Sequence, residues 1–371
     1  MRTRLALTAL AMATAVTAGL AAPATAAGPD PVRQDLETLV RSGEAPGALA
    51  SVKDAHGKFR TYTAGVGDRD TQAKVPRDGQ VRIGSVTKTF TAVTVLQLVR
   101  EGEISLEGHV EDYLPGVVRG ESIDGRAITV RQLLQHTSGL PDFEDDVTDD
   151  ILERRYLSPR DSLDIALTHK AVFEPGTKWS YSNTNYLVAG LIVQKVTGRP
   201  LPEVIAQRIL KPTGLRHTYF PAPGETTLRE HHPRGYREDS PGAPLRDVTE
   251  IDPSAAWAAG AMVSTPSDLN RFYSALLKGD LLAEPQLKEM LTSVPIKTGE
   301  DRYGMGLGIM KVRLSKDCVV WGHSGGIPGY GTWAGATEDG RAASVAMTRE
   351  PTTSEAVAHL EGVVDAALCR R

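Results

Sequence analysis

Apolar side chains recur along this chain with two different periods. Apolar positions three and four residues apart mark one face of a helix, whereas alternating positions mark a strand with one buried face. The first hundred residues predict a surface helix over 32–42, strands at 48–52 and 59–64, and a longer helix over Thr87–Glu101. This part of the chain therefore mixes both kinds of element.

The middle of the chain is mainly helical and rich in turn-forming residues. We expect helices over 129–135, 184–196 and 267–277, with a charged, turn-rich segment at 141–180. The stretch 221–254 is crowded with proline, glycine and charge, which predicts a long loop at the rim of the protein.

After residue 300 the period becomes that of strands. A hairpin turn is predicted at Asp339-Gly340, and a helix closes the chain over 354–368. The predicted strands are 303–312, 318–322, 330–336 and 342–348.

Strands and helices at both ends, with helices between them, predict one α/β (α+β) domain over residues 28–371. We expect an antiparallel sheet flanked by helices, formed by about 28–130 and 256–371. A mostly helical insertion is expected over about 131–255, with an active site where the two parts meet.

The first 27 residues have the pattern of a signal peptide. Arg2 and Arg4 precede an apolar run over 5–20, and small residues follow at Ala24-Thr25-Ala26. This order is typical of a cleaved export signal, and the apolar run is short for a membrane span. We therefore expect a secreted protein of the cell-wall space with no membrane anchor.

Charge and composition exclude several classes of partner. The chain has 42 Lys and Arg against 46 Asp and Glu. No basic block or heptad pattern indicates nucleic acid or a coiled coil, and a monomer is expected. Glu230-His231-His232 superficially suggests a metal site, but adjacent histidines in a polar loop are usually solvated. No metal or organic cofactor is implied.

The two cysteines, Cys318 and Cys369, both lie near the C-terminus. In an exported protein an isolated pair favours a disulfide over a metal site, with two free thiols as the alternative. Such a bond would tie the C-terminal helix to the strand that leads into His323.

Three short motifs carry the candidate chemistry: Ser85-x-x-Lys88, Tyr181-x-Asn183 and His323-x-Gly325. Ser85 opens a helix, where free backbone N–H groups favour developing negative charge. Lys88 follows three residues later, so its ammonium should lie on the same face. A serine hydroxyl needs a base to take its proton, and an amine can serve only if its pKa is lowered.

Each residue of the later motifs also has an ordinary structural explanation. Tyr181 could be a packing residue, Asn183 a helix N-cap, and His323 a residue on a strand surface. The occurrence of all three motifs in this order is what indicates an active site.

Together the motifs resemble those of the penicillin-recognising serine hydrolases, and most closely the secreted actinomycete D-alanyl-D-alanine carboxypeptidases of that family. The resemblance implies a β-lactamase/transpeptidase-like fold and an acyl-enzyme mechanism. It runs from about residue 30 to Cys369 and rests on five segments: Gly84-Ser85-Val86-Thr87-Lys88-Thr89-Phe90, His136-Thr137-Ser138-Gly139-Leu140, Tyr181-Ser182-Asn183-Thr184-Asn185, Ala259-Gly260-Ala261 and Gly322-His323-Ser324-Gly325.

The resemblance implies a role for each residue of the first two motifs. Ser85 attacks the substrate carbonyl and carries the acyl group. Lys88 and Tyr181 share the proton transfer, with the charge of the lysine making the phenol more acidic. Asn183 orients Lys88 and hydrogen-bonds the substrate amide. We expect His136 to hold its turn by a hydrogen bond and leave it outside the catalytic set.

The third motif is expected to form the strand edge that binds substrate. His323 supports the tyrosine and the leaving-group side of the cleft, and Ser324, Gly325 and Gly326 continue that edge. The oxyanion hole is expected to be the backbone N–H groups of Ser85 and Gly326.

The sequence departs from the family pattern where a terminal carboxylate should bind. The family arginine for that carboxylate aligns with Gly308, and a family threonine is replaced by Gly326. Lys311 or Arg313 could substitute, depending on strand register. We therefore expect weak carboxypeptidase activity, better turnover of esters or amides, and a gain in peptide cleavage from Gly308→Arg.

We interpret the chain as an exported, D-alanyl-D-alanine carboxypeptidase-like serine hydrolase. Its ligands would be peptidoglycan peptides or small esters and amides, and β-lactams that acylate Ser85. The alternatives are a β-lactamase-like esterase or amidase and a non-catalytic penicillin or peptidoglycan sensor. Gly322 to Gly326 also match the Gly-x-Ser-x-Gly nucleophile elbow, but a proline, a glycine and strands follow instead of the helix that the elbow requires.

Overall fold

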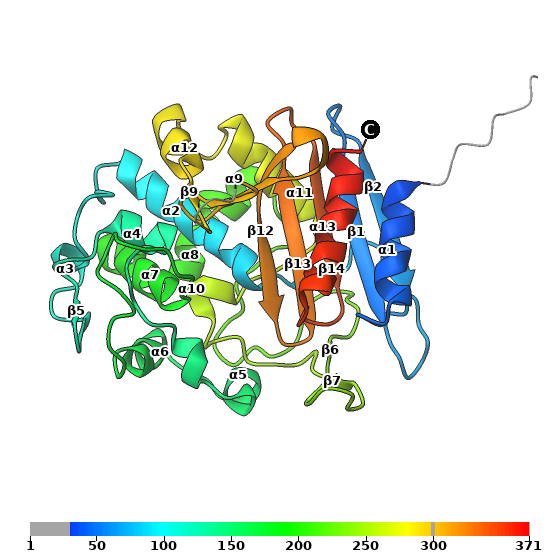
Figure 1. Cartoon of the computed structure of the whole chain (residues 1–371), viewed down its shortest axis with the longest axis horizontal. Coiled ribbons are helices and arrows are strands. Elements are labelled where there is room, and N and C mark those ends of the chain that lie inside the picture. The colour runs from blue at the N-terminus through cyan, green and yellow to red at the C-terminus, as the bar shows by residue number, and fades with distance from the viewer. Residues whose placement is uncertain (1–29, 298–300, 371) are drawn as a thin grey trace, which may run out of the picture.

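The computed structural model describes residues 30–297 and 301–370. The predicted signal peptide, residues 1–27, lies outside them. Within the described chain eight strands form one antiparallel sheet, which Figure 1 shows on the right of the molecule. In sheet order these strands are β2 (Phe59–Gly65), β1 (Gly47–Lys53), β14 (Ala342–Met347), β13 (Tyr330–Ala336), β12 (Val319–Ile327), β11 (Met310–Arg313), β10 (Tyr303–Met305) and β9 (Val294–Pro295).

Helices cover both faces of the sheet and fill the chain between β2 and β9. The α-helices are α1 (Pro31–Arg41), α2 (Thr87–Arg100), α3 (Val110–Tyr113), α4 (Val130–Gln135), α5 (Asp149–Arg154), α6 (Pro159–Ala166), α7 (Thr184–Thr197), α8 (Leu201–Ile205), α9 (Lys211–Thr213), α10 (Trp257–Gly260), α11 (Pro266–Lys278), α12 (Glu284–Leu291) and α13 (Ser354–Leu368). Shorter turns are η1 (Gly84–Val86), η2 (Phe143–Asp146), η3 (Ala206–Leu210) and η4 (Ser315–Asp317), and the two-stranded pairs are β3 (Val81–Arg82) with β8 (Val263–Ser264), β4 (Arg119–Gly120) with β5 (Ile123–Asp124), and β6 (Tyr236–Arg237) with β7 (Arg246–Asp247).

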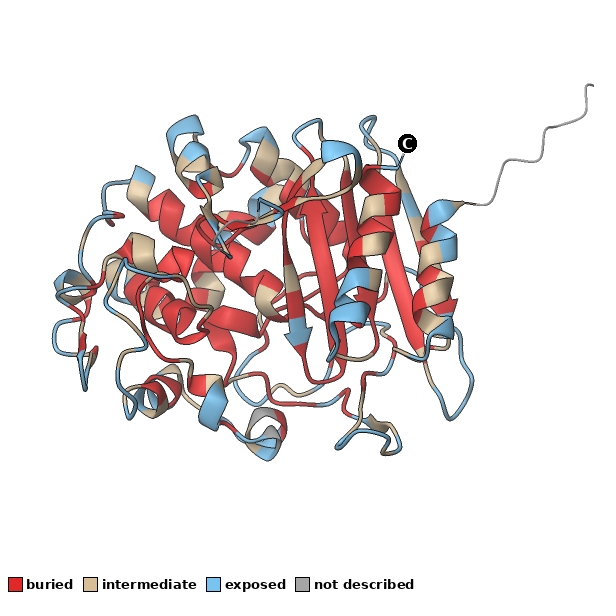
Figure 2. Ribbon diagram, viewed as in Figure 1, coloured by how far each residue is buried: buried red, intermediate tan, exposed pale blue. Residues whose placement is uncertain are grey.

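The sheet lies between two apolar layers. On one face α1 and α13 pack side by side and bury a cluster that includes Leu36, Leu39 and Val364. On the other face α11 contacts β14, β13 and β1, and the larger core continues from there into the helical region. Figure 2 shows the central strands and the inner helices as almost continuously buried. The predicted fold class, an antiparallel sheet flanked by helices, is confirmed.

The helical region begins earlier than the expected boundary near residue 130. α3 already contacts α7, and α2 packs between α7 and α10. The rim segment 221–254 is mostly irregular, as expected, apart from the short pair β6–β7. Buried Arg82 anchors it, because its guanidinium donates hydrogen bonds to the carbonyls of Thr226 and Thr249.

Two strand predictions need correction. The run 303–312 is not one strand but the hairpin β10–β11, because Gly308 adopts φ +72° in the turn between them. β12 extends to Ile327, five residues beyond the predicted end at 322, so the whole third motif lies on a strand. The glycines of β12 gave no alternating pattern, yet they lie in the run 321–327 that pairs with β13.

Candidate active site

The helical turn η1, which carries Ser85, approaches the sheet more closely than side chains would allow. A Cβ at Gly84, which has φ +49°, would lie 2.5 Å from the carbonyl oxygen of Gly326. A Cβ at Gly325 would lie 2.1 Å from the carbonyl oxygen of Ile83. Glycine at these positions therefore lets η1 sit directly against β12, with Ser85 in η1 at the strand edge.

Lys88 lies one turn from Ser85, as predicted, and is fully buried. Its Nζ atom lies 3.0 Å from Ser85 Oγ, 2.6 Å from Asn183 Oδ1 and 2.8 Å from the carbonyl oxygen of Ala259. Burial lowers the pKa of Lys88 from 10.5 to about 7, although the carboxylates of Glu144 and Asp142 oppose that shift.

These three contacts suit a neutral amine. A neutral amine has two N–H groups, which match the two carbonyl oxygens, and one lone pair, which can accept the proton of Ser85. Lys88 can therefore take the proton of Ser85 directly when it is uncharged.

Tyr181 also contacts the nucleophile. Its hydroxyl donates a 2.8 Å hydrogen bond to Ser85 Oγ, and its ring centroid lies 4.9 Å from Lys88 Nζ. Burial raises the pKa of the phenol well above 10, and Glu144 and Asp142 raise it further. Burial therefore outweighs the acidifying effect of Lys88 that the resemblance implies. Tyr181 is a neutral hydroxyl here, suited to donating or relaying a proton.

Asn183 is held in one orientation by Asp142. Both the backbone N–H and the side-chain amide N–H of Asn183 donate to Asp142 Oδ2, each at 3.1 Å. This leaves the amide oxygen facing Lys88. Asn183 does occupy the N-cap position of α7, but its side chain makes no capping hydrogen bond. The side chain belongs to the site, and the sequence pattern gave no indication of Asp142.

His323 is buried beside the site rather than exposed on the strand. Burial, together with the charge of Lys88, lowers its pKa to about 4, so the ring is neutral near pH 7. Its Nδ1 lies 2.5 Å from the carbonyl oxygen of Ser324, and its Nε2 has no hydrogen-bond partner among the described residues. The Oγ of Ser324 lies 3.9 Å from the sulfur of Met310 and does not line the cavity described next.

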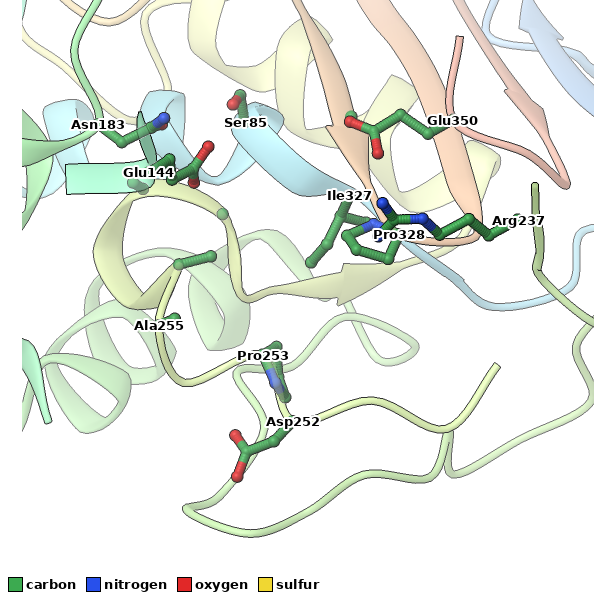
Figure 3. Close-up of a pocket in the computed structure, with 14 residues that line it drawn as sticks. Ser85, Glu144, Asn183, Arg237, Asp252, Pro253, Ala255, Ile327, Pro328 and Glu350 are labelled. Carbon is green, nitrogen blue, oxygen red and sulfur yellow. The ribbon is translucent and has the colours of Figure 1, made fainter. Parts of the chain in front are cut away.

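A cavity opens beside Ser85, lined also by Asn183, Gly326, Glu144 and Glu350. Figure 3 shows the two glutamates on opposite sides of the cavity with their carboxylates pointing inward. Burial and the neighbouring carboxylates of Asp142 and Glu350 raise the pKa of Glu144 to about 7. Sequence reasoning missed both glutamates, since an acidic residue in a charge-rich loop carries no distinctive signal.

Two further charged residues, Arg237 and Asp252, line the same cavity, and Figure 3 shows the Arg237 guanidinium on the side of Glu350. Arg237 donates a 3.3 Å hydrogen bond to buried Glu153. Asp252 points away from Ser85 in Figure 3 and accepts from the N–H of Ser254.

The residues expected to bind a terminal carboxylate lie elsewhere. Gly308 is buried against α2, where a Cβ would lie 2.4 Å from that of Ala92. The expectation that an arginine at 308 would face the substrate is therefore wrong, and so is the design Gly308→Arg. Lys311 lies over the ring of Trp321, and Arg313 pairs with Asp317. Neither lines the cavity.

The remaining sequence predictions concern the cysteines and the rim histidines. Cys318 and Cys369 form the predicted disulfide, which joins the start of β12 to the end of α13. The Glu230 carboxylate pairs with His217, and the ring of His232 contacts the backbone carbonyl of Glu230. No helix in the described part of the chain is long and apolar enough to cross a membrane.

Comparison with known proteins agrees with this geometry. The chain matches the family described as Beta-lactamase over residues 32–368. Among curated proteins it is similar to Penicillin-binding protein 4* of Bacillus subtilis (strain 168), 29% identical over 81% of this chain and 68% of that protein. It is also similar to Penicillin-binding protein 4 of Amycolatopsis lactamdurans, 31% identical over 65% of this chain and 61% of that protein.

Solved structures of amide hydrolases share the fold over nearly the whole chain. A D-stereospecific amidohydrolase from Streptomyces sp. superimposes with a TM-score of 0.85 at 39% identity, covering 92% of this chain and all of that one. D-amino acid amidase from Ochrobactrum anthropi SV3 gives a TM-score of 0.80 at 28% identity, covering 90% of this chain and 97% of that one.

Proposed function

Because the chain belongs to the β-lactamase family of serine hydrolases, we propose that it is an exported amidase that forms an acyl-enzyme on Ser85. Its substrates would be amides or short peptides of a D-amino acid with a free amino group beside the scissile carbonyl. The names of the two amidohydrolases with solved structures supply the D configuration and the amide bond. The free amino group is supported by the carboxylates of Glu144 and Glu350, which line the cavity of this chain.

The proposed reaction uses the contacts around Ser85. Neutral Lys88 takes the proton of Ser85 as Oγ attacks the carbonyl carbon. The carbonyl oxygen gains negative charge facing the N–H groups of Ser85 and Gly326. Tyr181 relays a proton from Lys88 to the leaving amine, which departs, and water then hydrolyses the ester on Ser85.

The observation that carries this proposal is the pair of carboxylates in the cavity. Glu144 and Glu350 face the space beside Ser85 from two sides. A substrate ammonium placed there would make charge-assisted hydrogen bonds, each contributing about 1.5–3 kcal/mol. The two carboxylates would repel the carboxylate of a C-terminal residue.

Cleavage of D-alanyl-D-alanine peptides is the second candidate function. It is favoured by the guanidinium of Arg237, which also lines the cavity and could receive a terminal carboxylate. The names of the two curated relatives, both penicillin-binding proteins, agree with acylation by β-lactams. A non-catalytic sensor is the least favoured, because Ser85, Lys88 and Tyr181 form one hydrogen-bonded set.

Three matched substrates test the proposal: D-alanine amide, N-acetyl-D-alanine amide and an N-acetylated D-alanyl-D-alanine peptide. We expect the free amine to be turned over best. Glu144→Gln should lower kcat/KM for it by roughly 10–100-fold, the cost of one charge-assisted hydrogen bond, and should affect the N-acetyl amide far less. Exposed Glu338→Gln is the control.

The outcomes separate the candidates. Preference for the N-acetylated peptide, with a selective loss in Arg237→Ala, would favour the carboxypeptidase and contradict an amine-recognising cavity. Stable acylation by a penicillin with no turnover of any amide or ester would indicate a sensor.

A further inference from the structure

His136 lies at the end of α4 and is fully buried next to the active site. It adopts φ +60° and ψ +39°, a left-handed conformation that is uncommon outside glycine, asparagine and aspartate. A residue is kept in such a conformation when its surroundings over-determine it. The surroundings of His136 include Asn185, whose amide nitrogen lies 3.3 Å from His136 Nδ1, and the tripeptide that contains Tyr181.

This one histidine contacts each residue of that tripeptide. Its carbonyl oxygen accepts a 3.0 Å hydrogen bond from the N–H of Ser180. Its Nδ1 accepts a 3.2 Å hydrogen bond from the N–H of Ser182. Between them, its ring stacks on the ring of Tyr181, with centroids 4.4 Å apart and planes inclined by 23°. The backbone on both sides of Tyr181 and the face of its ring are therefore fixed together.

The hydrogen bonds also determine the charge state of the imidazole. Because Nδ1 accepts from Ser182, the ring proton of the neutral form lies on Nε2. Burial and the charge of Lys88 hold the pKa of His136 well below 6.5. Nε2 has no hydrogen-bond partner among the described residues. An unpartnered buried donor costs stability, so its retention needs a reason other than folding.

We propose that His136 is a positioning residue that holds the Tyr181 hydroxyl against Ser85, within the acyl-enzyme reaction proposed above. Only 2.8 Å separates the two oxygen atoms. Among the described residues no other hydrogen bond holds the phenol there, and the ring can turn unless its face is supported. A neutral imidazole supports that face without adding a second positive charge beside Lys88.

A double-mutant cycle separates positioning from a general structural role. His136→Asn removes the ring, and asparagine tolerates the left-handed backbone. Its effect is measured in the wild type and in Tyr181→Phe, which keeps the stacked ring but lacks the hydroxyl. The readouts are the rate of acylation by a fluorescent penicillin at saturation, the apparent binding constant, and the urea midpoint. His56→Asn, in an exposed turn, is the control.

We expect His136→Asn to slow acylation by roughly 10–100-fold in the wild type, a part of the usual contribution of a proton-transfer group. In Tyr181→Phe the further loss should be below about threefold, because the hydroxyl that His136 positions is already absent. The urea midpoint should fall equally in both backgrounds, and the binding constant should change little.

Equal losses of acylation in both backgrounds would overturn the proposal, as would a loss confined to binding. If His136→Asn does not fold, His136→Phe keeps an aromatic ring for stacking and removes both ring nitrogens, including the Nδ1 acceptor. The same double-mutant cycle then applies. The acylation rate should fall by a smaller factor in the wild type and should not fall further in Tyr181→Phe. Absence of acylation in the wild type would instead contradict the proposed function, and with it this role.

Discussion

Replacing Gly84 by alanine should separate the nucleophile from the strand edge. Gly84 has φ +49°, where a residue with a Cβ costs roughly 1–2 kcal/mol. The added Cβ would lie 2.5 Å from the carbonyl oxygen and 2.8 Å from the nitrogen of Gly326. Both are backbone atoms and cannot rotate away, so η1 and β12 must move apart.

The movement displaces a proposed oxyanion donor, the N–H of Gly326. Loss of one such donor costs about 2.7–4 kcal/mol in the transition state, or 10²–10³ in rate. Gly57→Ala provides a matched control. Gly57 has φ +83°, and no neighbouring atom lies within 4 Å of the added Cβ. Gly57→Ala therefore introduces similar backbone strain without a steric clash.

Acylation by a fluorescent penicillin and urea unfolding should be measured on both variants. We expect both variants to lose stability. Only Gly84→Ala should also acylate roughly 10²–10³-fold more slowly than the wild type. If Gly84→Ala acylated within about threefold of the wild type, the N–H of Gly326 would not be an oxyanion donor.

Three further results are expected. Lys88→Ala and Tyr181→Phe should each slow acylation by roughly 10²–10⁴-fold, and a near-normal rate in Tyr181→Phe would exclude its hydroxyl from the mechanism. Because the proposed base is neutral Lys88, whose pKa is about 7, acylation by an uncharged ester should fall as the pH drops below that value and level off above it. A flat profile between about pH 5 and 8 would exclude Lys88 as the base. Replacing both Cys318 and Cys369 by alanine should lower the free energy of unfolding by about 4 kcal/mol in the chain-entropy model, and an unchanged urea midpoint would contradict that estimate.

The helices were predictable from the sequence because their apolar period is local. The helices expected at 184–196 and 267–277 match α7 and α11 within one residue at each end. β12 was predicted too short because its glycines have no side chains from which to read a period. Those glycines are needed for contact with η1, a tertiary requirement that no local pattern carries.

The site was predictable to the extent that its residues lie in motifs of fixed spacing. Ser85, Lys88 and Tyr181 come together as expected. Glu144 and Glu350 were missed because they lie 206 positions apart and only folding brings them to one cavity. Gly308 was wrongly assigned to the substrate side because an alignment of sequences does not show that this residue packs closely against Ala92 and the backbone of Lys88.

Mapping the acylated residue tests the central claim most directly. The protein is incubated with a penicillin, digested, and the peptide that carries the adduct is sequenced by mass spectrometry. We expect an adduct on Ser85, lost in Ser85→Ala and retained in Ser324→Ala. An adduct on Ser324, or labelling that survives Ser85→Ala, would contradict it.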